Sequence, residues 1–255
     1  MPATEPRDRT GKPGSRRLVA PLFFAVLAFT VLVALGTWQL QRLAWKEALI
    51  AAAGERAGAA AVDLPPPAGW PGLDLADHIY RKVTLTGRFR HDDEIHVYTA
   101  LTRAKGAHDG QGYWVMTPLE RDDGTIVFVN RGFVPLDFKA PETRAAGQIE
   151  GRVTVTGLLR APEPRGRFTV DDDRAKNVWI RRDPARFAAF LGLPADRVAP
   201  FFVDAEAGAS PGGLPQGGET LLAFTNNHLQ YALTWYGLAA VLVVVVGLFV
   251  RGRLR

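Results

Sequence analysis

Residues 18–35 read LVAPLFFAVLAFTVLVAL, and residues 232–250 read ALTWYGLAAVLVVVVGLFV. Neither run contains a charged side chain; Arg16 and Arg17 precede the first, and Arg251 follows the second. A helix needs about 20 residues, at ~1.5 Å each, to cross the ~30 Å hydrocarbon core of a membrane. A buried helix of a soluble core is the alternative, but uncharged runs of this length beside basic residues favour membrane spans. The sequence therefore predicts two transmembrane helices.

The positive charge of the chain is concentrated at its two ends. The formal net charge is +5 at pH 7. The first 17 residues carry five basic and two acidic side chains and the last five carry three arginines, so the ends hold +6 and the remainder −1. This distribution follows the positive-inside rule and is unlike the basic face that binds nucleic acid, so no nucleic-acid partner is expected. It predicts that both termini are cytoplasmic and that residues 38–228 lie on the opposite side.

The N-terminal run has a second interpretation as a cleavable signal peptide, because Ala34-Leu35-Gly36 offers small residues at a cleavage spacing. An uncharged run of 18 residues exceeds the roughly 7–15 of a signal peptide, which favours a retained span. The N-terminal tail contains two acidic residues, Glu5 and Asp8, whereas mitochondrial transit peptides are poor in acidic residues. We therefore expect a multi-pass protein of the bacterial inner (cell) membrane, with membrane lipid around its spans and a periplasmic central domain.

Between the spans the periodicity changes from helical to alternating. Residues 44–61 favour a continued helix, and Pro65-Pro66-Pro67 ends it. Short alternating runs follow, separated by turn residues, and they predict a mainly antiparallel sheet closed or half-closed into a small barrel or sandwich. Asp183 before Pro184 predicts the N-cap of a short helix over 184–191. The expected strands are 80–87, 94–101, 112–119, 125–134, 152–159, 177–180 and 200–203.

Two details of this region have more than one interpretation. Val83–Gly87 and Val153–Gly157 read alike, as two copies of a repeat or as two ordinary strands ending in glycine. Arg131-Gly132 follows a run of strand residues and indicates a β-bulge more than a functional site.

The fold class is thus a membrane protein in which two transmembrane helices flank a mainly antiparallel β domain with a short helix. The expected segments are a cytoplasmic tail (1–17), transmembrane helix 1 (18–37), a helix extension and Pro-rich linker (38–72), an extracytoplasmic β domain (73–205), a Gly/Pro-rich return (206–226), transmembrane helix 2 (227–250) and a cytoplasmic tail (251–255).

Motifs for catalysis are scarce. The sequence has no serine nucleophile elbow, paired-histidine zinc helix or phosphate-binding glycine loop. It has no cysteine, which excludes disulfides, and its two methionines offer little soft ligation for Cu(I). His91 and His96 lie near three acidic residues, but a polar turn entering a strand explains them better than a metal site. We expect no enzymatic activity.

The entry to the second span is rich in polar and aromatic residues. In a helix, Asn227, Gln230, Tyr231 and Thr234 share one face, and His228, Tyr231 and Trp235 share an adjacent one. Polar groups at this depth are costly without a partner, so we expect the first of these stripes to face the other span.

The outer end of the first span supplies Trp38, Gln39 and Arg42. Together the two ends offer a site for haem, because a neutral imidazole from His228 can ligate iron, Arg42 can pair with a propionate, and aromatic rings can flank a porphyrin. An interfacial aromatic belt and a snorkelling arginine explain the same residues without a ligand.

Five motifs resemble those of the SURF1 family. The segment Asn226–Tyr236 is similar to the family signature at the start of the second span, and Gly36–Gln39, with Arg42 and Lys46, is similar to the motif that closes the first. The resemblance covers about residues 20–250 in matching order. Phe133 stands where many members have Trp, and Ala188 or Ala189 where Met is common. The matching central motifs are Gly112-Tyr113 with Thr117-Pro118-Leu119, Val129–Pro135, and Asn177, Trp179 and Asp183.

This resemblance implies a role in assembling the haem–copper cytochrome c oxidase, with delivery of haem a to its subunit I and haem a synthase as a further partner. His228 is then the expected axial ligand of the haem iron, and Trp38, Arg42, Tyr231 and Trp235 are expected to shape the site. One alternative is a membrane scaffold that stabilises an oxidase assembly intermediate without binding haem. Another is an enzyme acting on haem, akin to haem a synthase, which calls for more than one intramembrane histidine.

Overall fold

The computed structural model describes residues 16–208, 210–220 and 226–254, and the chain divides into two compact units. One unit contains residues 1–50 and 223–255, and the other contains residues 51–222. Of the predicted N-terminal tail, only Arg16 and Arg17 are among the described residues. Residues 209 and 221–225 of the predicted return segment also lie outside them.

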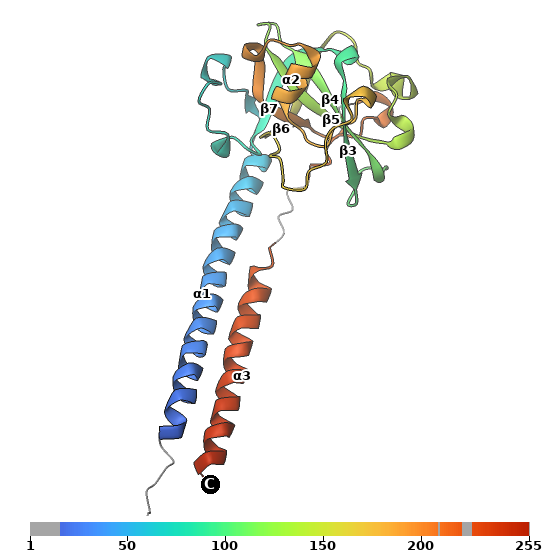
Figure 1. The fold of residues 1–255 in the computed structure, drawn as a ribbon. Coiled ribbons are helices and arrows are strands. Elements are labelled where there is room, and N and C mark those ends of the chain that lie inside the picture. The colour runs from blue at the N-terminus through green and yellow to red at the C-terminus, as the bar shows by residue number, and fades with distance from the viewer. Residues whose placement is uncertain (1–15, 209, 221–225, 255) are drawn as a thin grey trace, which may run out of the picture. The chain divides into compact units, whose positions relative to one another are not determined.

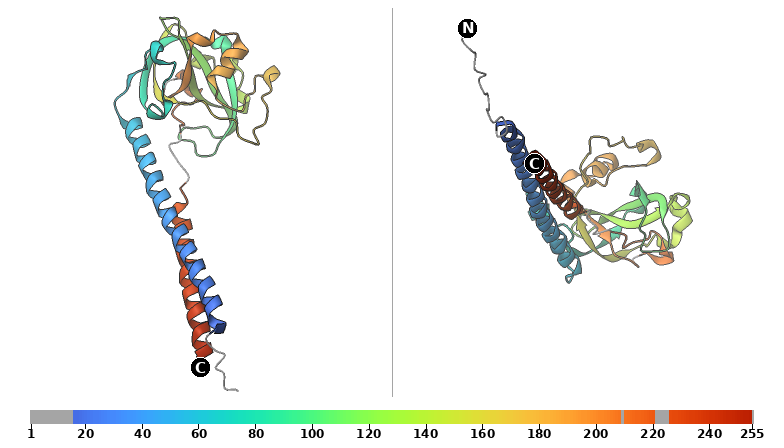
Figure 2. Two further views of the ribbon diagram at one scale, coloured as in Figure 1. Left: turned by 60° about the vertical axis from the view of Figure 1, so that its left-hand side comes forward. Right: turned by 90° about the horizontal axis from the view of Figure 1, so that it is seen from below.

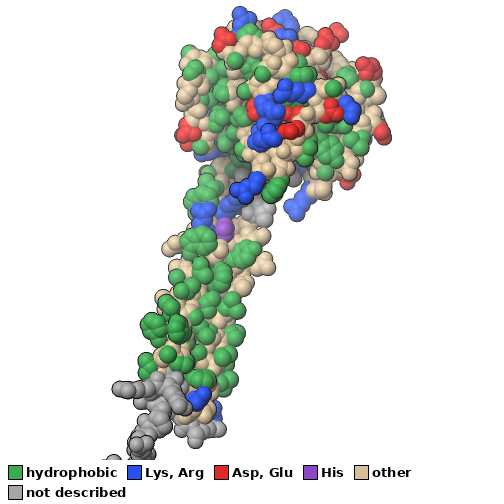
Figure 3. All heavy atoms as spheres, viewed as in Figure 1, with side chains coloured by type: hydrophobic (Ala, Val, Ile, Leu, Met, Phe, Trp, Pro, Cys, Tyr) green, Lys and Arg blue, Asp and Glu red, His purple; other side chains and the backbone are tan. Residues whose placement is uncertain are grey.

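Two long helices, α1 (Arg16–Gly58) and α3 (His228–Leu254), confirm the predicted spans. Figure 1 shows α3 alongside the N-terminal part of α1, and the two helices stay next to each other in the views of Figure 2. Only 6% of the residues in the apolar window of either helix are buried, whereas the core helix of a soluble protein is mostly buried. Hydrophobic side chains cover most of the hairpin face in Figure 3. The hairpin therefore presents the surface that a lipid bilayer requires.

The β domain is a closed barrel (Figure 1), which is one of the predicted alternatives, a closed or half-closed barrel or a sandwich. Its strands follow the order β2-β6-β7-β5-β4, and pairing of β4 with β2 closes the ring. Strands β1 and β3 extend the sheet, and β5–β7 and β1–β2 are its parallel pairs. The strands are β1 (Val62–Asp63), β2 (Lys82–Phe89), β3 (Ile95–Leu101), β4 (Gly110–Glu120), β5 (Ile126–Pro135), β6 (Arg152–Arg160) and β7 (Val198–Ala205).

The two similar stretches of sequence are neighbours in the barrel. Strands β2 and β6 pair antiparallel with Leu85 opposite Val155, and the flanking threonines pair across the strands. A Cβ on Gly87 would lie 2.4 Å from the carbonyl oxygen of Glu120, and one on Gly157 would lie 2.3 Å from that of Asp204. Each glycine thus lets a neighbouring strand approach closely. The lack of space for a side chain explains why both stretches end in glycine.

Three apolar clusters pack the described part of the β domain, and two of them are large. One includes Val83, Leu119 and Phe201, and the other packs α2 (Pro184–Leu191) through Phe187 against Trp179. The predicted cap of α2 is confirmed, because the Asp183 side chain accepts a hydrogen bond from the backbone N–H of Arg186.

The predicted strand at 177–180 is wrong. Asn177 adopts a left-handed conformation at φ 50°, and the segment makes only isolated bridges, from Trp179 to Val97 and from Val178 to Asp173, among the described residues. A left-handed residue interrupts an extended strand, so the fully buried Trp179 packs against α2 from a segment that is not a strand.

Candidate functional site

Small residues form the seam between α1 and α3. Gly36 on α1 and Ala232 and Ala239 on α3 are buried in a hairpin that is otherwise largely exposed. A Cβ on Gly36 would lie 2.9 Å from the ring of Tyr236, so that ring packs directly on the α1 backbone. Such residues let membrane helices approach closely and favour dispersion contact between them.

Two polar contacts join the helices near this seam. The hydroxyls of Thr37 and Tyr236 lie 3.0 Å apart, and Nδ1 of His228 lies 2.7 Å from Oε1 of Gln39. Both residues of the second pair are half-buried. The outer parts of the predicted site, one from each end of the chain, therefore meet through His228 and Gln39.

The Gln39 contact determines which nitrogen of His228 is available. A side-chain carbonyl oxygen only accepts hydrogen bonds, so Nδ1 of His228 must carry the proton and donate it to Gln39. In a neutral imidazole the other nitrogen, Nε2, then carries the lone pair. Nε2 has no hydrogen bond to any residue that the structure describes. The histidine is thus oriented as metal-ligating histidines commonly are, with one nitrogen anchored and the other open.

The expected polar stripe on α3 does not face α1. Asn227, Gln230, Tyr231 and Thr234 are all exposed, and the Thr234 hydroxyl donates to the carbonyl of Gln230 in its own helix. The face toward α1 carries the small residues instead, because they permit the closest approach of the backbones. The prediction for this stripe is therefore wrong.

The other predicted site residues make no hydrogen bond to His228 or Gln39 among the described residues. The side chains of Trp38 and Tyr231 are 50% and 54% exposed, and Trp235 is half-buried. The guanidinium of Arg42 lies 4.2 Å from the ring centroid of Trp45, in a cation–π contact. The hairpin thus combines one oriented imidazole with exposed aromatic rings and a cation. Neither the Trp45 contact nor the role of Gln39 was predicted. Gln39 follows Gly36 by three residues, so both lie on one face of α1, and this spacing could have indicated that Gln39 faces α3.

The second polar site of the chain is buried in the β domain. His91–Asp93 forms the predicted turn before β3, and the described residues hold no group of three or more His, Cys, Asp or Glu fit to bind a metal. Glu94 instead accepts hydrogen bonds from His96, at 2.7 Å, and from two nitrogens of Arg144. Burial alone would raise the pKa of Glu94, but the hydrogen bonds from His96 and Arg144 lower it from 4.5 to about 2.

A third cluster surrounds Asp204, whose side chain is 2% exposed. Its carboxylate accepts hydrogen bonds from the Asn130 amide, the Thr220 hydroxyl and the guanidinium groups of Arg160 and Arg182. Because every donor comes from the chain itself, we assign this cluster a structural role.

Comparison with known proteins gives consistent matches over most of the chain. A family model described as the SURF1 family matches residues 26–240. Surfeit locus protein 1 of Homo sapiens is 38% identical over 217 residues, covering 81% of this chain and 69% of the relative. The mouse protein of the same name is 36% identical over 86% of this chain and 72% of its own length. A SURF1-like protein of Drosophila melanogaster is 37% identical, over 87% of this chain and 75% of the relative.

Proposed function

The chain belongs to the SURF1 family of cytochrome c oxidase assembly factors, and we propose that its part in assembly is to bind haem a at the helix hairpin and deliver it to oxidase subunit I. Haem a is the cargo in this proposal, and haem a synthase is the partner that supplies it. The charge at the two ends supports cytoplasmic termini in a bacterial inner membrane, with the His228 end of the hairpin at the outer face.

The observation that carries the proposal is the anchored imidazole. Nδ1 of His228 donates to Gln39 at 2.7 Å, which leaves Nε2 as a lone-pair donor for the haem iron. Trp38 and Tyr231 offer exposed rings on which a porphyrin can pack. Arg42, stacked on Trp45, offers a cation for a propionate. A single imidazole suits a carrier, because the protein must release its cargo as well as bind it.

The test is the visible spectrum of the full chain purified from cells that make haem a. We expect the wild-type protein to carry haem a and the His228→Ala variant to lose it. Gln230→Ala is the matched control, because Gln230 is an exposed polar residue of the same helix, and it should keep wild-type haem. A wild-type protein without haem, or equal haem in the wild type and the His228→Ala variant, would refute the ligand assignment.

Replacing Gln39 by Leu is expected to weaken haem binding about 10–100-fold, the usual effect of losing the partner that orients a metal-ligating histidine. Leu cannot accept the Nδ1 proton, whereas Glu can, so Gln39→Glu should retain most of the affinity. Haem titration of the three detergent-solubilised proteins measures the difference. If Gln39→Leu binds haem as tightly as the wild type, Gln39 does not position His228.

A scaffold without haem remains the second candidate, and one observation favours it. The Gly36–Tyr236 packing and the Thr37–Tyr236 contact at 3.0 Å join the helices without any ligand. The two functions differ in what they require of His228. If His228→Ala cells assemble active oxidase at the wild-type level, and the variant still cross-links to oxidase subunits, the scaffold explains the protein. Loss of oxidase haem a with retained cross-linking favours the carrier.

A further inference from the structure

Strand β5 contains one more residue than its partner can pair. Val115 of β4 lies opposite Gly132, and the next residue, Met116, lies opposite Asn130, so Arg131 has no partner in β4. This is the bulge predicted at Arg131-Gly132. A bulge changes the direction in which a side chain points. Here it accompanies an arginine that is only 2% exposed.

The buried guanidinium of Arg131 has neutral partners. It donates to the carbonyl of Gly147, to Oε1 of Gln148 at 3.3 Å and to Nδ1 of His91 at 3.5 Å, and it lies 4.8 Å from the Phe89 ring centroid. Burial lowers the pKa of Arg131 to about 10, so the group is still a cation at pH 7. A buried cation is costly unless an anion pairs with it, and no described carboxylate lies within ion-pair distance.

Hydrogen-bond donors remain unused at this position. A guanidinium has five N–H groups, and Arg131 makes three hydrogen bonds to described residues. The adjacent Nε2 of Gln148 is buried and likewise has no partner among them. Glu94, the nearby acid, is already held by Arg144 and His96. The vicinity thus has spare donors and a positive charge, which is the complement of an anion.

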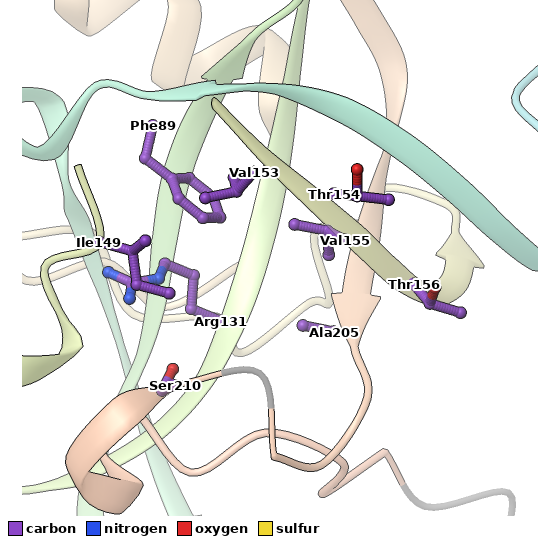
Figure 4. Close-up of a pocket in the computed structure, with 9 residues that line it drawn as sticks. All are labelled: Phe89, Arg131, Ile149, Val153, Thr154, Val155, Thr156, Ala205 and Ser210. Atoms are coloured by element: carbon purple, nitrogen blue, oxygen red, sulfur yellow. The ribbon is translucent and has the colours of Figure 1, made fainter. Parts of the chain in front are cut away.

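A cavity of about 250 Å³ adjoins this arginine. A single water needs roughly 10–15 Å³ by the same kind of measure, so the cavity is far larger than a packing defect. Figure 4 shows Phe89 and Val153 above the space, Val155 and Ala205 to its right, Arg131 to its left and the Ser210 hydroxyl below. Most of the lining is therefore apolar, with the cation on one wall, a combination typical of small-molecule sites.

We propose that this cavity binds a small organic anion, a carboxylate on a short apolar body. The carboxylate pairs with Arg131, and the apolar body packs on Phe89, Val153 and Val155. The site lies wholly within the β domain and contains no residue of the α1–α3 hairpin. The experiment that tests this site therefore does not depend on whether the haem proposal is correct.

The test uses the full chain in a non-ionic detergent and three probes: hexanoate, hexanol and inorganic phosphate. A ligand that binds the folded state raises its thermal stability. We expect hexanoate to raise the Tm in a saturable way. Hexanol lacks the carboxylate and phosphate lacks the apolar body, so each should bind at least tenfold more weakly than hexanoate. Arg131→Gln should weaken hexanoate binding at least tenfold. Arg152→Gln, at a surface ion pair whose side chain is 58% exposed, is the matched control and should bind normally.

A second variant covers the case in which Arg131→Gln does not fold. Val153→Phe keeps the charge but fills the cavity, so it should fold and lose hexanoate binding. Hexanol or phosphate binding as tightly as hexanoate would overturn the proposal. Undiminished hexanoate binding by either Arg131→Gln or Val153→Phe would also overturn it.

Discussion

Replacing Glu94 by Gln is expected to lower the free energy of unfolding of the β domain by about 3–5 kcal/mol, because it leaves a buried arginine without its anion. The side chain of Arg144 is 1% exposed, and Glu94 is its ion-pair partner. Gln has nearly the same shape as Glu, so the change removes the charge without opening a cavity. Chemical denaturation of the full chain, followed by tryptophan fluorescence, measures the loss.

The matched control is Asp122→Asn, which removes an ion pair to Arg152 whose side chains are 52% and 58% exposed. Such surface pairs contribute about 0–1 kcal/mol, so the control should be close to the wild type. The folded-state pKa of Glu94 is depressed to about 2. Its contribution is therefore fully present above pH ~4.5 and lost as the pH falls toward 2, on the order of 3 kcal/mol. A Glu94→Gln effect below 1 kcal/mol, or an unchanged acid profile, would contradict this role.

Replacing Asp204 by Ala is expected to destabilise the β domain by a similar amount, about 3–5 kcal/mol. The change removes the acceptor for four donors, and the side chains of Arg160 and Arg182 are only 17% and 12% exposed. Thr220, the last described residue before the gap at 221–225, loses its contact to the barrel as well.

Asp171→Ala is the control for this prediction, since the Asp171 side chain is 84% exposed and pairs with Arg165 at the surface. It should change the free energy of unfolding by less than ~1 kcal/mol. The unfolding midpoint in urea, measured for both variants, separates the two cases. Equal stability of the two variants would show that the Asp204 cluster does not hold the barrel.

Local signals in the sequence predicted the elements they directly control. Uncharged runs predicted α1 and α3, and Asp183 before Pro184 predicted the start of α2. Closure of the barrel was left as one of several outcomes, because the β2–β4 pairing of Arg88 with Glu120 joins residues far apart in sequence. The strand predicted at 177–180 failed because Asn177 adopts a left-handed conformation, which interrupts an extended backbone.

The candidate site was predictable in its parts and not in its contacts. His228 stood out as a lone imidazole at a membrane boundary, but its partner Gln39 lies 189 residues away. Which residues of α3 meet α1 depends on the rotation of both helices. Packing of Gly36 against Tyr236 fixes that rotation, and polarity alone indicated the wrong face.

The surplus residue in β5 has a genetic consequence. An in-frame loss of codon 131 would make Asn130 and Gly132 consecutive residues, still opposite Met116 and Val115. The register of the β4–β5 pair would therefore be kept. Loss of a codon a little further along, at Phe133, would instead turn the remaining strand residues over to the opposite face. Deletion of codon 131 would therefore remove the buried positive charge of Arg131 and still leave the β4–β5 hydrogen bonds in register.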